Sequence, residues 1–288
     1  MSFDNTQLTI VNGFKVSNIV FGKAREGTIP NTPVTFKRLP IGVRNPDGTL
    51  GEFVLETPEC YSFGLSENTK MDTGKPDGFT LSLCLYNREN PTDEQKKWVD
   101  TFNSIVEHIK EYLVNNRDEI GKYELEMGDL KKLNPLYYKK EKGKIVDGAG
   151  PVLYPKVIEN KKTNAISTPF LDKSGNDIDP MTVLNKHCYA KAAIKFEGVF
   201  VGAKLSLQIK VYEAEVRLID TGIKRLLRKP QVNEQVVMEA KPDDEKEDDG
   251  SVKGSDSESD SEDNEPAPAP VPVAAKAAPV RRTVQRKP

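Results

Sequence analysis

Side chains over residues 186–212 alternate between apolar and polar with a period of two, which is typical of β-strands that bury one face. The first stretch, KHCYAKAAIKFE, places on its apolar face Cys188, Ala190, Ala192, Ile194 and Phe196. The second, KLSLQIKVY, places on its apolar face Leu205, Leu207, Ile209 and Val211. With Val-Gly-Ala between them, the two stretches predict a hairpin that rests on a core. The phase slips afterwards, which predicts a β-bulge near Tyr212–Glu213.

The opposite face of this hairpin is expected to be basic and aromatic. It would carry Tyr189, Lys191, Lys195, Lys204, Lys210 and Tyr212. Lysines neutralise phosphates, and bases stack on aromatic rings regardless of sequence, so this chemistry suits a surface for single-stranded nucleic acid. The alternative is an ordinary solvated sheet face, on which lysine is common. On the binding hypothesis, replacing Lys191 or Lys210 with alanine weakens binding and flattens its salt dependence.

Two further basic clusters extend the set of candidate binding residues. Residues 131–144 hold six lysines against one glutamate, with two tyrosines in the middle. A second cluster, in the run IKRLLRKP that ends at Pro230, either binds phosphate or receives an acidic segment of the same chain. The candidates from the two clusters are Tyr137, Tyr138, Lys139, Lys140, Lys224 and Arg225.

The earlier part of the chain predicts mostly strands. Asn12-Gly13 lies between two apolar runs within 8–22, which is a signal for a hairpin. Further strands are expected within 34–43, 51–66 and 79–86, and a strand pair within 148–180, with its turn at Ser174-Gly175-Asn176.

One long amphipathic helix interrupts the strands. Thr92 and Gln95 have the spacing of a capping box. Apolar residues then recur at helical spacing from Trp98 to Leu113, and the helix should end before Gly121. His108 lies beside this apolar face, where we expect a partly buried structural residue.

The net charge of −2 hides a sharp partition. Residues 241–265 carry 3 positive and 12 negative charges, whereas residues 266–288 carry five positive and no negative charges. Neither segment has enough apolar side chains to offset the entropy of folding. We therefore predict a folded domain over 1–230 and a disordered tail over 231–288. The acidic tract would compete for a basic surface or dock partners; the alternative is a solvated tail that aids solubility.

Several classes of function lack their sequence features. The three cysteines (Cys60, Cys84 and Cys188) are widely spaced, which favours buried, reduced thiols, and neither a phosphate-binding loop nor a G-x-S-x-G motif occurs. The loop that begins at Asp172 lacks the glycine and glutamate of a calcium site. No apolar stretch approaches a membrane span, and the first residues do not resemble a signal peptide. We expect an intracellular protein without a cofactor that is not an enzyme.

The run GPVLYPKVI…ISTPFLDKSGNDIDP…CYAKAAIKFEGVFVGAKLSLQIKVYEAEV (150–216) resembles the single-stranded DNA-binding proteins of nucleocytoplasmic large DNA viruses, which are considered related to phage-type OB-fold proteins. The resemblance implies an OB-like β-barrel with an inserted helix that binds single strands across a strand face. It also implies a role in viral DNA replication, recombination or repair, in the cytoplasmic viral factory or the nucleus of an infected cell. In the phage-type proteins the acidic tail is terminal, whereas here a basic segment follows it.

We therefore predict a mainly β, OB-like domain that binds single-stranded DNA independently of sequence. The expected partners are single-stranded DNA and, through the acidic tail, replication proteins; no membrane is expected, and a homo-oligomer is compatible with the sequence. The main alternative is a structural or virion interaction protein whose tail recruits partners. An enzyme is a third alternative, in which Asp177 and Asp179 bind a metal, but these two carboxylates have no evident third ligand.

Overall fold

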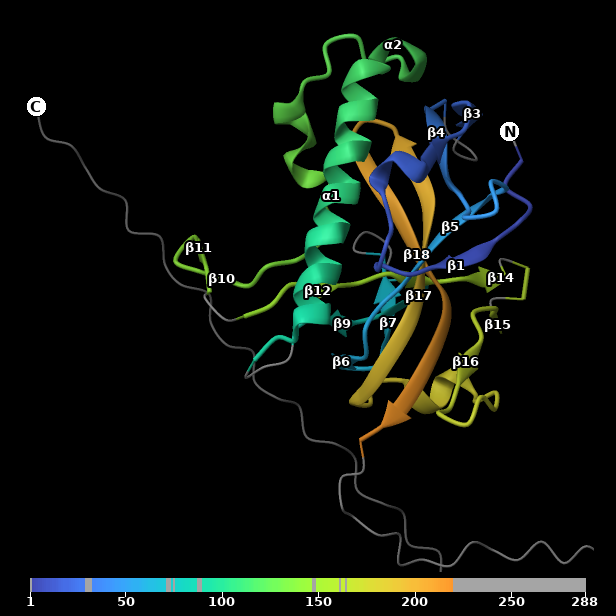
Figure 1. Cartoon of the computed structure of the whole chain (residues 1–288), viewed down its shortest axis with the longest axis vertical. Coiled ribbons are helices and arrows are strands. Elements are labelled where there is room, and N and C mark those ends of the chain that lie inside the picture. Colours follow the sequence, from blue (N-terminus) through green and yellow to red (C-terminus); the bar gives the residue numbers. More distant parts are fainter. Residues whose placement is uncertain are drawn as a thin grey trace, which may run out of the picture. The chain divides into compact units, whose positions relative to one another are not determined.

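Two strands of fourteen residues, β17 (Cys188–Val201) and β18 (Leu205–Leu218), form the centre of the sheet (Figure 1). They belong to a computed structural model that describes residues 2–28, 33–70, 74, 76–86, 90–146, 149–160, 162–163 and 165–219. The predicted tail, and with it Lys224 and Arg225, lies outside the described residues.

The predicted hairpin is confirmed, and so is its bulge. Ala193 lies opposite Glu213, but Ile194 lies opposite Val211, so Tyr212 is the extra residue. The alternation has the expected physical basis, because every residue predicted for the apolar face except Leu205 is buried. A second irregularity follows Phe196.

Each edge of the hairpin pairs with several strands. Further strands pair with β17. From its last residues to its first they are β4 (Thr35–Arg44), β5 (Leu50–Glu56) and β6 (Cys60–Ser62). Along β18 lie, in parallel, β13 (Lys156–Val157) and β16 (Phe170–Leu171). Beyond them pair β7 (Leu65–Thr69), β8 (Pro76–Leu81), β9 (Leu83–Cys84) and β12 (Val152–Leu153).

The fold is mainly β with one long helix, as predicted, but the sheet is open and not a closed barrel. The hydrogen-bonded path runs β1-β5-β4-β17-β18-β13-β8-β7, and no pairing between described strands joins its two ends. Two bends divide the strands instead: Phe63 and Gly64 separate β6 from β7, and Ser82 separates β8 from β9. β6 and β9 pair on the β17 side, and β7 and β8 pair on the β18 side.

The hairpin predicted around Asn12-Gly13 is wrong. The turn is present, since the Phe14 amide donates to the Val11 carbonyl at 3.3 Å and Gly13 has a φ of +81°. The strands beside it, β1 (Gln7–Thr9) and β2 (Ile19–Phe21), pair with β5 and β4 and not with each other. The longer strands β5 and β4 offer these two short strands more backbone hydrogen bonds than a local turn does. The short helix η1 (Val16–Asn18) also separates the two runs.

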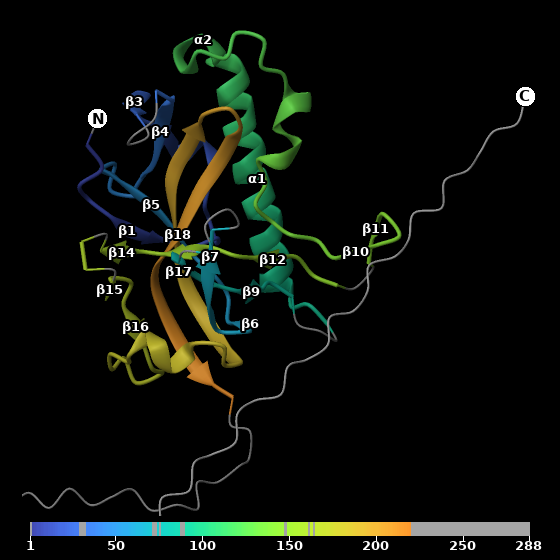
Figure 2. The same cartoon turned by 180° about the vertical axis from the view of Figure 1, so that it is seen from behind.

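Helix α1 (Asp93–Asn115) packs on the buried face of the sheet (Figures 1 and 2). Both hydrogen bonds of the capping box between Thr92 and Gln95 are present, so this prediction is confirmed. Phe196 of β17 lies between Phe102 of the helix, at 5.5 Å, and Phe53 of β5, at 4.5 Å between ring centroids. The short helix α2 (Arg117–Ile120) follows and ends at Gly121 in the left-handed conformation.

His108 is half-buried beside Phe21, with ring centroids 6.0 Å apart, as expected of a structural residue. The remaining short elements connect these layers. They are β3 (Arg25–Thr28), η2 (Met127–Lys132), β10 (Lys140–Glu141), β11 (Lys144–Ile145), β14 (Glu159–Asn160), β15 (Ala165–Ile166) and η3 (Pro180–Val183). Within the described part of the chain, no helix is both long enough and apolar enough to cross a membrane.

Candidate nucleic-acid interface

One row of directly opposed residues crosses the solvent-exposed side of the sheet near the first residues of β17. Tyr189 lies opposite Tyr61 of β6, Tyr61 opposite Cys84 of β9, Cys84 opposite Val152 of β12, and Val152 opposite Tyr137. Residues opposed in neighbouring strands point to the same face of a sheet. The register therefore places Tyr137, from the lysine-rich segment, on the same face as Tyr189 of the hairpin.

Aromatic rings gather along this row and form what we call the aromatic face. Its members are Tyr61, Phe63, Tyr137, Tyr154, His187 and Tyr189. The ring of Tyr61 lies edge-on to those of Phe63 (5.5 Å), His187 (5.6 Å) and Tyr189 (6.0 Å). Tyr137 and Tyr154 form a second pair, at 6.4 Å. Exposed fractions of 43% for Phe63, 57% for Tyr137 and 47% for Tyr154 leave ring surface open for stacking.

Two polar contacts hold the rings of the aromatic face. The hydroxyl of Tyr61 is hydrogen-bonded to Nδ1 of His187. The guanidinium carbon of Arg217, directly opposite Tyr189, lies 4.4 Å from the centroid of the Tyr189 ring. Arg217 also forms an ion pair with Glu59 at 3.3 Å. Because these contacts fix ring orientations before any ligand arrives, less conformational entropy is lost on stacking.

The predicted lysines of the hairpin do point to the exposed side, but they are paired with carboxylates. Lys195 and Lys210 lie directly opposite each other, and Lys156 of β13 continues the row beside Lys210. Their partners are Glu52 at 2.5 Å, Glu197 at 2.8 Å and Asp77 at 2.9 Å, respectively. This lysine row is therefore close to electrically neutral.

Lys191 and the outer ends of the hairpin complete the predicted set. Lys191 forms an ion pair with Glu56 at 2.5 Å, and the hydrogen bond to that carboxylate raises the pKa of the lysine above its ordinary value. Tyr212 lies at the bulge and is 38% exposed. Lys204 lies in the exposed turn of the hairpin, at the end opposite to Tyr189.

The candidates from the lysine-rich segment divide between surface and core. Only Tyr137 joins the aromatic face, because Tyr138 is half-buried and packs against the hydrophobic core. Lys139 is exposed and forms an ion pair with Glu141 at 3.0 Å, and Lys140 is exposed in β10. The structure therefore does not bring Tyr138 to the surface that the other tyrosines share.

Sequence reasoning missed four members of the aromatic face, Tyr61, Phe63, Tyr154 and His187, and also Arg217 and Lys156. Tyr61 and Phe63 alternate with buried Cys60 and Ser62, and this period of two was the available signal. Nothing local to the sequence marks Lys156, whose place in the row depends on a parallel pairing with β18.

The cysteines and acidic turns have structural roles. None of the three cysteines is in a disulfide; Cys60 and Cys188 are buried, whereas Cys84 is half-exposed in the aromatic face, contrary to the expectation of three buried thiols. Burial raises the pKa of Cys60 to about 12. Asp179 accepts a hydrogen bond from the Met181 amide at the start of η3. Among the described residues, no three His, Cys, Asp or Glu side chains gather where a metal could bind.

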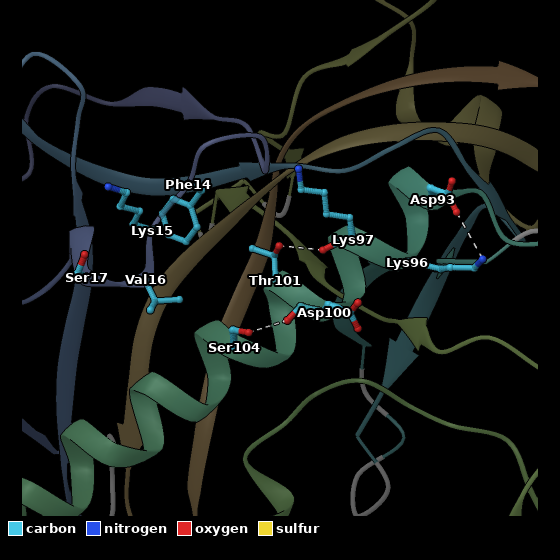
Figure 3. Close-up of a pocket in the computed structure, with 10 residues that line it drawn as sticks. All are labelled: Phe14, Lys15, Val16, Ser17, Asp93, Lys96, Lys97, Asp100, Thr101 and Ser104. Carbon is cyan, nitrogen blue, oxygen red and sulfur yellow. Dashed lines mark hydrogen bonds and ion pairs between the residues drawn. The ribbon is translucent and has the colours of Figure 1, made fainter.

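A recess of about 640 Å³ lies between the first turns of α1 and residues 14–17 (Figure 3). Its two hydroxyls serve the helix: Thr101 donates to the Lys97 carbonyl at 2.8 Å, and Ser104 donates to the Asp100 carbonyl at 2.9 Å. Two of its three lysines are also engaged, since Lys97 donates to Asn12 and Lys96 pairs with Asp93. This arrangement gives no nucleophile beside a base.

Two curated viral proteins are similar in sequence. The chain is 34% identical over 162 residues to "Uncharacterized protein 007R" of Invertebrate iridescent virus 3, a match that covers 55% of this chain and 34% of that protein. It is 25% identical over 160 residues to the "Early 31 kDa protein" of Frog virus 3 (isolate Goorha), covering 54% and 60%. The matches thus span about a third and three fifths of these relatives.

Two solved structures align with the fold. The single-stranded DNA-binding protein of bacteriophage Enc34, solved with single-stranded DNA, has a TM-score of 0.39 at 11% identity, over 62% of this chain and 91% of that one. For gp2.5, a single-stranded DNA binding protein of bacteriophage T7, the TM-score is 0.35 at 14% identity, over 59% and 89%. Scores of this size reflect a partial geometric likeness.

The model of one protein family matches residues 13–255, which include nearly all the described residues. A match of this length covers both the sheet with its aromatic face and the helix behind it. The chain therefore belongs to the family described as "Protein of unknown function (DUF2738)".

Proposed function

We propose that this chain binds single-stranded DNA independently of sequence, with the aromatic face as its stacking surface. The observation that carries the proposal is the register that aligns Tyr189, Tyr61 and Tyr137 across the strands on one exposed face. Each base has a π-face, so a row of rings accepts any sequence, with about 1–3 kcal/mol per stacked base.

In this proposal the charge of the lysines contributes less to the affinity for DNA than their number in the sequence indicated. The lysine row and Lys191 are neutralised by Glu52, Glu56, Glu197 and Asp77. A phosphate must compete with these carboxylates, so fewer counterions are released than there are lysines on the face. We infer a salt dependence that is shallow for a binding site of this size.

The biological role that we propose is in viral DNA replication, recombination or repair. The two curated relatives are viral proteins and one is named an early protein, which supports a viral role early in infection. In this proposal the acidic residues 241–265 compete with DNA for basic groups and recruit replication proteins. A chain that ends at Ala240 would then bind DNA more tightly than the full chain.

The test is fluorescence anisotropy of labelled oligo-dT over a salt series, with duplex DNA and RNA as competitors. Tyr61→Leu and Tyr189→Leu keep apolar bulk and remove the rings, so each should weaken binding about 5- to 150-fold, the equivalent of one lost stacking contact. Tyr123→Leu is the matched control, because Tyr123 is 70% exposed and lies outside the aromatic face.

Two outcomes would overturn the proposal. If neither the full chain nor the chain ending at Ala240 binds any polynucleotide at low salt, the structural or interaction protein becomes the better hypothesis. If oligo-dT binds but all three tyrosine variants bind equally well, the aromatic face is not the binding surface.

A further inference from the structure

A second basic and aromatic site lies at the other end of the hairpin, beside its turn. Four directly opposed residues form a row across the sheet: Arg25 of β3, Arg38 of β4, Phe200 of β17 and Ser206 of β18. Phe36 is the neighbour of Arg38 on the same face. Of these, Arg25, Phe36, Arg38 and Phe200 line a groove of about 480 Å³, together with residues of the neighbouring backbone. We refer to it as the arginine groove.

The aromatic floor of the arginine groove is held in place by glycines. The rings of Phe36 and Phe200 lie 4.9 Å apart at 31°, and both are half-buried. A Cβ atom on Gly27 would lie 2.6 Å from the Phe36 ring, and one on Gly202 would lie 2.7 Å from the Phe200 ring. The absence of side chains at these two glycines lets each ring lie against the backbone.

The arginines of the groove are its uncompensated charges. The two carboxylates in its lining are already paired, Glu26 with Lys37 at 3.7 Å and Glu197 with Lys210 at 2.8 Å. In contrast, no ion pair joins Arg25 or Arg38 to any residue that the structure describes, and both are exposed. The Arg38 guanidinium carbon lies 5.3 Å from the centroid of the Phe36 ring. This differs from the lysine row, where each cation has a carboxylate.

We propose that the arginine groove binds one or two nucleotides of the same single strand that crosses the aromatic face. Guanidinium groups bind phosphate oxygens through paired hydrogen bonds, and the half-buried rings of Phe36 and Phe200 offer a stacking surface for one base. This inference rests on the proposed function, to which it adds a second contact point and a direction. In this proposal the DNA strand runs along the exposed side of the hairpin from Tyr189 to Phe200 and passes over the neutral lysine row.

The length of the hairpin sets the length of DNA. Tyr189 and Phe200 are eleven residues apart in β17, which is about 36 Å at a rise of about 3.3 Å per residue. A strand with the duplex spacing of about 3.4 Å per nucleotide needs about eleven nucleotides to cover it, and a more extended strand needs fewer. This length falls within the range of about 4–16 nucleotides known for OB-type sites.

The test compares long and short oligo-dT in anisotropy with the full chain. Arg25→Ala and Arg38→Ala together should flatten the salt dependence of binding to a long oligonucleotide by about 1.4, at about 0.7 per phosphate contact on a single strand. Phe200→Leu should weaken binding about 5- to 150-fold, as expected for a lost stacking contact. An oligonucleotide of about 4 nucleotides is too short to reach from the aromatic face to the arginine groove. When such an oligonucleotide occupies the aromatic face, these variants should bind it as tightly as the unchanged chain does.

Arg44→Ala is the matched control, since Arg44 is an exposed arginine of the same strand β4 that lies outside the groove. A salt dependence unchanged by the double arginine substitution, with Tyr61→Leu and Tyr189→Leu still weakening binding, would overturn the groove and leave the proposed function standing. Loss of binding in the tyrosine variants alone would also exclude the groove. If the unchanged chain binds no single-stranded DNA, both proposals fail.

Crosslinking gives a second readout that does not depend on the folding of variants. Oligonucleotides that carry a photoreactive base at one end should crosslink to Phe36 or Phe200, and those with the reactive base at the other end should crosslink to the aromatic face. Crosslinks confined to the aromatic face, whichever end carries the reactive base, would contradict the groove.

Discussion

The ammonium nitrogen of Lys191 lies 2.5 Å from a carboxylate oxygen of Glu56, and the backbone carbonyl of Glu56 accepts a hydrogen bond from Trp98 Nε1 at 2.7 Å. One residue of β5 thereby connects a lysine on the exposed face of the hairpin to the helix on its buried face. Since Trp98 uses the backbone and Lys191 uses the side chain, the two contacts can be separated by mutation.

Removing the carboxylates should increase DNA binding. Glu52→Gln and Glu56→Gln each release one lysine and keep the shape of the side chain, so affinity for oligo-dT should rise and the salt dependence should steepen by about 0.7 per released lysine. The measurement is anisotropy over a salt series. Glu111→Gln removes a negative charge from the exposed side of α1, which controls for net charge. Equal behaviour of all three variants would mean that the lysines do not touch phosphate.

Cys84 offers a footprint of bound DNA, because it lies in the aromatic face between Tyr61 and Val152. In the native protein it should react with a maleimide well before Cys60 and Cys188, which are buried, and burial also raises the pKa of both these thiols. Saturating oligo-dT should slow the labelling of Cys84. Mass spectrometry of labelled peptides measures the order in which the three cysteines react. Labelling of Cys84 that is equally fast with and without bound DNA would place the strand elsewhere.

Two phenylalanines should separate stability from binding. Phe196 is fully buried between Phe53 and Phe102, so Phe196→Ala should lower the free energy of unfolding by about 3–5 kcal/mol. Phe63 is 43% exposed, so Phe63→Ala should change stability by less than about 1 kcal/mol and yet weaken DNA binding. Urea denaturation followed by the fluorescence of Trp98, the single tryptophan, measures the first effect, and anisotropy measures the second. The reverse pattern would contradict both the core and the site.

Local patterns in the sequence predicted the hairpin and the helix, because each buries one face and so shows its period directly. The capping box was predictable because Thr92 and Gln95 have its local spacing, and the bulge at Tyr212 because the period slips there. Non-local pairing was not predictable: Tyr61 reaches Tyr189 only through the pairing of β6 with β17, which is also why a local turn signal at Asn12-Gly13 failed.

The sequence predicted which types of residue lie on the candidate surface, but not that carboxylates neutralise its lysines. Alternation places Lys195 on the exposed face, yet its partner Glu52 lies 143 positions earlier in the chain and reaches it through the edge of β5. Likewise, the arginine groove joins residues of β3, β4 and β17 that share no motif. Each of these features depends on the register between distant strands, which the sequence of one strand does not contain.

Asp77 and Lys156 should make stability depend on pH in the acid range. The hydrogen bond from Lys156, at 2.9 Å, lowers the pKa of Asp77 below 3.8. Since the carboxyl binds its proton less readily in the folded chain, the pair stabilises fully above pH 3.8, and this contribution is lost as pH falls through the lowered pKa. Both side chains are about half-exposed, so Asp77→Asn should reduce the free energy of unfolding near neutral pH by only about 0.2–1 kcal/mol.

The free energy of unfolding at two pH values tests the contribution of this ion pair. In urea denaturation, the unchanged chain and Asp77→Asn should differ near neutral pH and converge at a pH well below 3.8, where both lack the charge. Glu124→Gln, which removes an exposed carboxylate that has no ion pair with any described residue, should show no comparable contrast. A difference for Asp77→Asn that persists in acid would mean that the side chain contributes through packing or hydrogen bonding of the neutral form, and not through its charge.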